Sequence, residues 1–291
     1  MSETAKLFID SHCQLGEGPF WNHLRGQLFW FDINGKTLFA ADSAGTIVNR
    51  WNFDRMPSAA GIVDEDTLIV AAQGAILELD LITSETRIVA PLEPELPGNR
   101  SNDGRVGPAG GLWIGTMARD EVLYSGSVYQ YRDGELKKLF GDIRIPNATC
   151  FSPDGRTVYF TDTPNKIILA RSIDPSSGEP TGFWRVFADT SKDPGAPDGA
   201  VVDSEGYLWS ARWGGSRVIR YTPDGRVDRE VRLPVSQVTC PAFGGPDLKT
   251  LYITSAAKNL SPEALAKEPH AGGVFAIQLD VAGQRETLIR P

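Results

Sequence analysis

A strand pattern repeats six times along the chain, and this repeat constrains the fold more than any other feature. In each repeat, a turn rich in Gly, Asp or Pro leads into an apolar strand with an aromatic or aliphatic residue at one fixed position. Successive fixed positions are 39, 44, 46, 50 and 43 residues apart. Periods of this length are typical of propellers and solenoids. The six positions are Trp30, Ile69, Trp113, Tyr159, Trp209 and Tyr252.

A second strand of like character follows the first in every repeat, for example over residues 37–42 and 273–280. Two hairpin strands, with one strand before and one after, make the four-stranded blade of a propeller. No repeat holds the roughly ten to fifteen residues of helical periodicity that a crossover helix needs, which argues against a parallel α/β fold. The sequence therefore predicts an all-β, six-bladed β-propeller that forms a single domain over residues 1–291.

Closing such a ring requires strands from both chain ends to share one blade. The N-terminal segment 6–13 is the candidate donor, since it reads as a short apolar strand. One helix is expected over residues 261–267, where Ser261 can cap the first turn and Pro262 takes the first helical position.

Charge and composition exclude several partners. The formal net charge of −8, with no cluster of Lys and Arg, argues against nucleic acid. The N-terminus lacks a basic segment followed by a long apolar stretch, and no run of about 18 apolar residues occurs, so a cytoplasmic protein without membrane contact is expected. The three cysteines are widely spaced, as in reduced core thiols. A monomer or weak homodimer is the expected state.

Four polar residues share one phase of the repeat and are expected to meet on the propeller axis. Each lies 11 to 13 residues before the fixed position of its blade, where the innermost strand should run, and has Gly or Pro nearby. In the second blade the same phase falls near Pro57 and Ser58, and in the sixth near Thr239, none of them charged. The four polar residues are Glu17, Asn102, Asn147 and Asp198.

Two carboxylates and two amides form a hard oxygen donor set, which favours Ca²⁺, Mg²⁺ or Mn²⁺. Two carboxylates brought together in a channel of low dielectric constant repel each other, and a divalent cation removes that cost. The alternative is a hydrogen-bonded polar plug, or motifs that act only as turn formers. The coincidence of four such residues in one phase favours an axial metal site.

The motifs around these residues resemble those of the regucalcin (senescence marker protein), gluconolactonase and luciferin-regenerating enzyme family of six-bladed propellers. They run nearly from end to end in the family order: LGEGPFW, NRSNDGRVGPAGGLWIGTM, IPNATCFSPDGRTVYFTDT, PDGAVVDSEGYLWSARWGG, FGGPDLKTLYITSA and AGGVFAI. The resemblance implies a bacterial-type sugar lactonase that uses one divalent metal ion, with Ca²⁺, Mg²⁺, Mn²⁺, Zn²⁺ and Fe²⁺ all open.

The resemblance also implies roles for individual residues. Glu17, Asn147 and Asp198 would be the metal ligands, with Asn102 close to both the ion and the substrate. Arg100 would contact a substrate hydroxyl or the ring oxygen.

An acidic substrate-binding residue that follows the GTMA motif in relatives falls at Asp120, with Glu121 as its competitor. A solvated pair of Arg100 and Asp120 on the propeller face is the alternative for these two side chains.

The expected reaction is hydrolysis of an aldonolactone, such as a glucono-, xylono- or arabinonolactone, to the free sugar acid. A divalent ion can polarise the carbonyl oxygen and supply the water, and Asp198 is the expected general base. Two other functions remain open at this stage: an organophosphate hydrolase on the same fold, and a non-catalytic calcium-binding propeller. Arg100, Asn102 and Asp120 favour a polyol substrate over an organophosphate.

Overall fold

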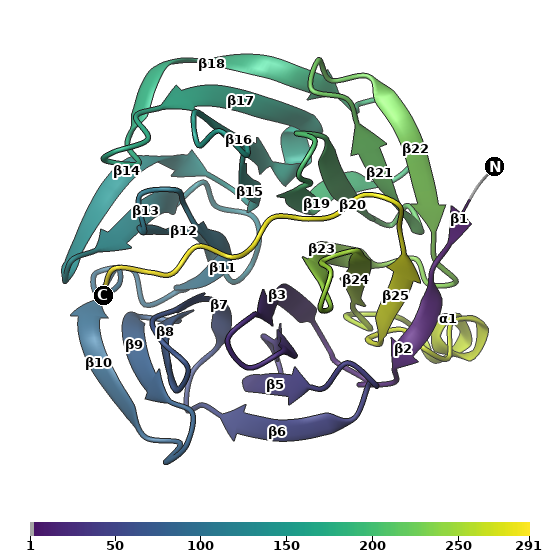
Figure 1. Cartoon of the computed structure of the whole chain (residues 1–291), viewed down its shortest axis with the longest axis horizontal. Helices are drawn as coiled ribbons and strands as arrows, with labels where there is room; N and C mark the ends of the chain where they lie inside the picture. The colour runs from purple at the N-terminus through teal and green to yellow at the C-terminus, as the bar shows by residue number, and fades with distance from the viewer. Residues whose placement is uncertain (1–2) are drawn as a thin grey trace.

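Six β-sheets stand around a central axis in the computed structural model, which describes residues 3–291 (Figure 1). This is the six-bladed β-propeller that the repeat predicts. In the first four blades the strand that comes first in sequence lies nearest the axis, and the next three follow outward. The first three blades consist of β3 (Gly16–Asn22), β4 (Gln27–Asp32), β5 (Thr37–Ala41) and β6 (Ile47–Asn52); β7 (Pro57–Ile62), β8 (Thr67–Ala72), β9 (Ala75–Asp80) and β10 (Thr86–Pro91); and β11 (Asn99–Val106), β12 (Leu112–Ala118), β13 (Gly126–Arg132) and β14 (Glu135–Ile143).

The other three blades repeat this plan, with additions at the chain ends. They consist of β15 (Pro146–Phe151), β16 (Thr157–Asp162), β17 (Ile167–Ile173) and β18 (Pro180–Asp189); β19 (Ala196–Val202), β20 (Leu208–Trp213), β21 (Arg217–Tyr221) and β22 (Val227–Arg232); and β23 (Val238–Gly244), β24 (Thr250–Ser255) and β25 (Val274–Gln278). The fifth and sixth blades begin at the axis with β19 and β23 and end on the outside with a strand from the N-terminus.

The N-terminus closes the ring, as the sequence predicts. Strand β2 (Lys6–Ile9) pairs antiparallel with β25 and completes the sixth blade. The sequence did not predict β1 (Glu3–Thr4), which pairs parallel with β22 as a fifth strand of the fifth blade. The expected helix is present as α1 (Pro262–Lys267), and the Ser261 side chain accepts a hydrogen bond from the Ala264 N–H. Within residues 3–291, no helix has the length and apolar character needed to cross a membrane.

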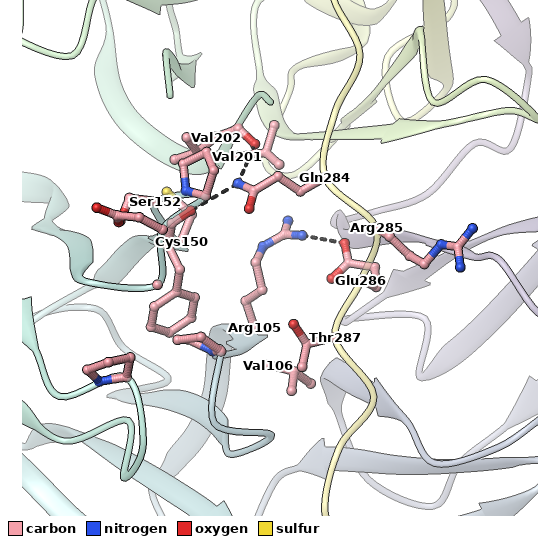
Figure 2. Close-up of a pocket in the computed structure, with 16 residues that line it drawn as sticks. Arg105, Val106, Cys150, Ser152, Val201, Val202, Gln284, Arg285, Glu286 and Thr287 are labelled. Atoms are coloured by element: carbon pink, nitrogen blue, oxygen red, sulfur yellow. Dashed lines mark hydrogen bonds and ion pairs between the residues drawn. The ribbon is translucent and has the colours of Figure 1, made fainter. Parts of the chain in front are cut away.

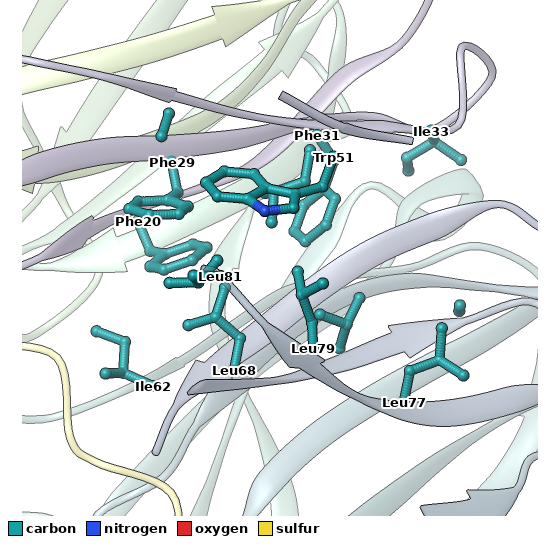
Figure 3. Close-up of a cluster of buried hydrophobic side chains, with 14 of the residues drawn as sticks. Phe20, Phe29, Phe31, Ile33, Trp51, Ile62, Leu68, Leu77, Leu79 and Leu81 are labelled. Atoms are coloured by element: carbon teal, nitrogen blue, oxygen red, sulfur yellow. The ribbon is translucent and has the colours of Figure 1, made fainter. Parts of the chain in front are cut away.

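The hydrophobic core lies between neighbouring blades. Figure 3 shows one such layer, where aromatic residues of the first blade face aliphatic residues of the second. The Phe29 ring is 5.2 Å from the Phe20 ring and 5.7 Å from the Trp51 ring, and Ile62 and Leu68 pack on the other side. All six fixed-position residues of the repeat are buried in such layers. The innermost strands are therefore held by packing on both faces, which fixes the residues at the axis.

The C-terminal tail, residues 279–291, crosses the ring on one face (Figure 1). Several of its backbone N–H groups donate to residues at or near the turns that join the first and second strands of a blade. The Gly283 N–H donates to the Leu248 carbonyl, the Ile289 N–H to the Ile62 carbonyl, and the Arg290 N–H to the Gly110 carbonyl. The tail therefore ties the sixth, second and third blades together, and it closes this end of the axial channel.

An ion pair joins the tail to the interior of the ring. Arg105 on β11 extends toward the tail and donates to the Glu286 carboxylate, and their side chains are 14% and 15% exposed (Figure 2). Beside this pair, the Gln284 Nε2 donates to the Phe151 and Val202 carbonyls. The tail thus supplies polar partners to groups that would otherwise face an open channel.

Replacing Glu286 with alanine is expected to lower the free energy of unfolding by about 2 to 3 kcal/mol, because the largely buried Arg105 then loses its ion-pair partner and keeps only the charge of Asp103 nearby. The double variant Arg105→Met/Glu286→Leu should lose less, since no charge remains unpaired. Urea unfolding of both variants, with the exposed Glu135→Ala as control, measures the difference. An equal loss in the single and double variants would contradict this role for the ion pair.

Candidate functional site

The innermost strand of every blade contains a β-bulge at the phase where the sequence predicts the axial residues. The shift in register begins at Glu17 in β3 and at Asn147 in β15, and it encloses Asn102 in β11 and Asp198 in β19. The innermost strands of the second and sixth blades carry the same shift. A bulge bends the strand and redirects its side chains. The repeated bulge explains how residues from four blades face one point.

A glycine follows each of the two carboxylates because no larger residue fits there. Gly18 has a φ of +54°, and a Cβ atom on it would lie 2.3 Å from the Ser58 carbonyl oxygen. A Cβ atom on Gly199 would lie 2.4 Å from the Cys240 sulfur. Such approaches are closer than side-chain carbons allow, so both glycines are needed for the inner strands to pack against their neighbours. This accounts for the LGEGP and PDGA motifs.

The four predicted axial residues line one cavity, at the end of the ring opposite to the tail. Glu17, Asn102, Asn147 and Asp198 are all buried, with at most 7% of each residue exposed. They form one part of its polar wall. Eight further residues complete the lining, four of them apolar: Leu15, Arg100, Met117, Glu121, Ile145, Thr163, Trp213 and Lys258.

A chain of hydrogen bonds orients the two amides. The Arg100 guanidinium donates to Asn102 Oδ1 over 2.7 Å, and Asn102 Nδ2 donates to Asn147 Oδ1 over 3.1 Å. Asn147 Nδ2 donates in turn to the Thr163 hydroxyl over 2.8 Å. Each amide nitrogen is therefore engaged by the protein. An amide oxygen has two lone pairs, so Asn147 Oδ1 keeps one acceptor position for a ligand.

The two axial carboxylates are buried next to each other and have no cationic partner within ion-pair distance among residues 3–291. Burial raises the pKa of Glu17 to about 8, and the charge of Asp103 adds to the rise. Burial also raises the pKa of Asp198 well above its ordinary value, with the Glu17 charge as the second cause. Two ionised carboxylates in this position are unfavourable unless a cation joins them.

This donor set fits a divalent cation. Among the residues that the structure describes, no group of three or more His, Cys, Asp and Glu side chains is arranged to hold a metal, so the carboxylates of Glu17 and Asp198 need the Asn147 amide oxygen as a third donor. All three are oxygen ligands, as hard cations prefer. A cation would also offset the burial and the neighbouring negative charges that raise the pKa of both carboxylates. The residues present therefore satisfy both the chemistry and the electrostatics of such a site.

The structure places Asp120, the expected substrate contact, outside the axial cavity. This residue is exposed, does not line the axial cavity, and its carboxylate accepts a hydrogen bond from the Val122 N–H over 3.0 Å. Glu121 lines the cavity instead. The reason is local: Glu121 has a left-handed backbone, with a φ of +61°, which turns its side chain inward and leaves Asp120 at the turn. The surface pairing of Arg100 with Asp120 is also absent, since Arg100 is 6% exposed and bonded to Asn102.

Several cavity residues escaped the sequence analysis because they share a different phase of the repeat. Trp213 ends β20, Thr163 directly follows β16, and Lys258 follows β24 at a short distance. Glu121 likewise follows the end of β12 at a short distance. The residues that follow the second strand of a blade therefore form the rim of the cavity. A search of the sequence for polar and aromatic residues directly after the second strand of each repeat would have identified these rim residues.

The fold and the site define a six-bladed β-propeller with an oxygen-donor site on its axis. A family model described as "SMP-30/Gluconolactonase/LRE-like region" matches residues 15–257, and the chain belongs to this family.

Individual relatives are similar over nearly their full length. An L-arabinolactonase of Azospirillum brasilense is 37% identical over 284 residues, which cover 96% of this chain and 93% of the relative. A 6-deoxy-6-sulfogluconolactonase of Pseudomonas putida is 35% identical over 290 residues and covers 99% of both chains. The crystal structure of a calcium-binding protein, regucalcin, from Agrobacterium tumefaciens superposes with a TM-score of 0.97 at 38% identity, and the match covers 100% of this chain and 99% of that one.

Proposed function

We propose that this chain hydrolyses a sugar lactone to the free sugar acid, as a carboxylic ester hydrolase with one divalent cation on the propeller axis. The observation that carries the proposal is the pair of buried carboxylates, Glu17 and Asp198, which meet the Asn147 amide in a cavity open to solvent. The names of the relatives, an L-arabinolactonase and a 6-deoxy-6-sulfogluconolactonase, support a lactone substrate. The regucalcin structure, which is described as calcium-binding, supports a divalent cation.

Glu17, Asn147 and Asp198 would hold the cation, which when bound would polarise the lactone carbonyl and lower the pKa of water. Asp198 is the proposed general base: it accepts the proton of the attacking water and returns it to the leaving ring oxygen. Glu17 is proposed to hold the cation without taking part in proton transfer, and the Gly18 N–H donates to its Oε2 over 3.1 Å.

Arg100, Asn102 and Glu121 are the proposed substrate contacts. Arg100 Nη1 donates to Asn102 Oδ1 and to the Ser101 carbonyl, which leaves the N–H groups of Nε and Nη2 available for hydroxyls or the ring oxygen. The apolar wall formed by Met117, Trp213 and their neighbours suits the C–H faces of a sugar ring. A cavity with both kinds of wall fits a polyol lactone.

Replacing Glu121 with glutamine is expected to raise KM for a sugar lactone by about 10-fold or more, because a hydrogen bond to a charged group is lost. Asp120→Asn is the matched control and should stay within about 2-fold, since that side chain lies outside the cavity. Steady-state kinetics on one lactone measure both. A larger effect at Asp120 than at Glu121 would reverse the assignment made from the structure.

A pH-indicator assay on glucono-, xylono-, galactono- and arabinonolactones tests the proposed function. The protein is assayed with Ca²⁺, Mg²⁺, Mn²⁺ or Zn²⁺ and again with a chelator, and one or more lactones should be hydrolysed only with metal. Hydrolysis that persists in chelator would overturn the metal dependence. If no lactone is hydrolysed with any metal, a phosphotriester panel and calcium calorimetry decide between an organophosphate hydrolase and a non-catalytic calcium-binding propeller.

A further inference from the structure

An ion pair spans the mouth of the axial cavity. Lys258 Nζ donates to Glu121 Oε1, and both residues line the cavity. Lys258 follows β24 of the sixth blade, and Glu121 follows β12 of the third. These two blades face each other across the ring (Figure 1). A contact between their loops therefore crosses the axis, directly over the residues that line the cavity.

Both ends of this bridge are fixed through their backbones. Gln237 Nε2 donates to the Lys258 carbonyl over 2.9 Å, and Arg144 Nε donates to the Glu121 carbonyl over 2.6 Å. The two side chains remain partly accessible, with 20% of Lys258 and 37% of Glu121 exposed. An ion pair that is this exposed contributes only about 0 to 1 kcal/mol to stability. A ligand that offers comparable hydrogen bonds can therefore replace or share it.

Lys258 lines the cavity and has donors that no acceptor among the described residues engages. Its ammonium has three N–H groups, and Glu121 is its one hydrogen-bond acceptor among residues 3–291. Lys258 lines the same cavity as Glu17 and Asp198, and its charge lowers the pKa of both carboxylates. The other cation in the lining, Arg100, already donates to Asn102 and to a backbone carbonyl.

We propose that Lys258 is a substrate-binding residue that determines specificity: its ammonium and the Glu121 carboxylate bind neighbouring hydroxyls on the carbon chain of the lactone. The ammonium donates to one hydroxyl oxygen, and the carboxylate accepts from the other hydroxyl. A sugar hydroxyl both donates and accepts, so adjacent hydroxyls match a donor and an acceptor that already touch. This inference rests on the proposed function and narrows it to lactones that carry two adjacent free hydroxyls.

The test compares Lys258→Met and Lys258→Arg with Lys267→Met, which changes a lysine of α1 outside the cavity. On the best lactone of the panel, with saturating metal, Lys258→Met is expected to raise KM about 10-fold or more and to change kcat by less than about 3-fold. Lys258→Arg should retain most of the affinity, and Lys267→Met should match the wild-type protein. Thermal unfolding of each variant checks that it is folded.

Monodeoxy lactones locate the contact. For the lactone that lacks the hydroxyl bound by Lys258, the KM of the wild-type protein should rise to that of Lys258→Met, and the substitution should have no further effect. An equal increase in KM for every deoxy lactone, or a fall in kcat at constant KM, would overturn the role in hydroxyl recognition.

Calorimetry of the metal-loaded protein with xylitol or glucitol gives a readout that does not depend on catalysis. Binding should be weaker in Lys258→Met than in Lys267→Met. If lactones are hydrolysed but Lys258→Met alters neither KM nor polyol binding, the proposed function stands and the role of Lys258 is wrong. If polyols bind in a Lys258-dependent way but no lactone is hydrolysed, the role of Lys258 stands and the proposed function is wrong.

Discussion

Replacing Asp198 with asparagine is expected to lower kcat/KM for sugar-lactone hydrolysis by about 10²- to 10⁴-fold, the range that a positioned general base contributes. Asparagine keeps an oxygen at the same place on the β19 bulge but can no longer accept a proton at neutral pH. Steady-state kinetics at saturating metal measure the loss. Asp189→Asn, an exposed change in the fourth blade, serves as the control and should leave the rate unchanged.

The contrast with Glu17→Gln separates the two carboxylates. Glu17 is proposed to hold the cation without taking part in proton transfer, so its substitution should weaken metal binding, and excess metal should restore most of the rate. Excess metal should not restore the rate of the Asp198→Asn variant. If a higher metal concentration rescues both variants to a similar degree, Asp198 acts only as a ligand, and the general base must be sought elsewhere in the cavity.

The repeat in the sequence was sufficient to predict the architecture and the axial residues. Each blade buries an aromatic or aliphatic residue at the same position, such as Trp30 or Trp209, so a constant spacing translates directly into a constant place in the fold. The phase about a dozen residues earlier falls in the innermost strand for the same reason. Glu17 and Asp198 could therefore be placed together although they lie in different blades and far apart in sequence.

Features that occur once could not be predicted in this way. The tail over residues 279–291 has no counterpart in the other repeats, and its hydrogen bonds go to residues of five different blades. The bridge between Lys258 and Glu121 joins residues 137 positions apart, and nothing in either segment indicates the other. Asp120 and Glu121 differ only in the local backbone: a single residue with positive φ decides which carboxylate points inward.

The bulge also limits what alternation in the sequence can show. In a regular strand, Asn102 and Asp103 would point to opposite faces of the sheet. The strand instead shifts register between Ser101 and Gly104. Asn102 therefore lines the open cavity, whereas Asp103 lies at the end covered by the tail, near Arg105 and Glu286. The Asn-Asp-Gly motif thus places a polar side chain at each end of the channel.

Without metal, the protein is expected to lose stability as the pH rises from about 4.5 to about 8. The pKa of Glu17 is about 8 in the folded chain, against an ordinary value of 4.5. A group whose folded pKa is raised stabilises the fold while it is protonated, and that contribution is lost as the pH rises through this interval. The loss from Glu17 should be about 3 to 5 kcal/mol, since each pH unit is worth about 1.4 kcal/mol. Asp198, whose pKa is also raised, acts in the same direction.

A bound divalent cation should reverse this dependence, because it favours the ionised carboxylates and its binding releases their protons. As the pH rises from 5 to 9, the thermal midpoint is therefore expected to fall in chelator. In saturating metal it should stay constant or rise. In chelator at pH 8, the double variant Glu17→Gln/Asp198→Asn should be more stable than the wild-type protein, and metal should no longer stabilise it. The exposed Glu65→Gln is the control and should follow the wild-type curves. A wild-type curve in chelator that is as flat as that of the double variant would mean that the two carboxylates are not the groups that link pH, metal and stability.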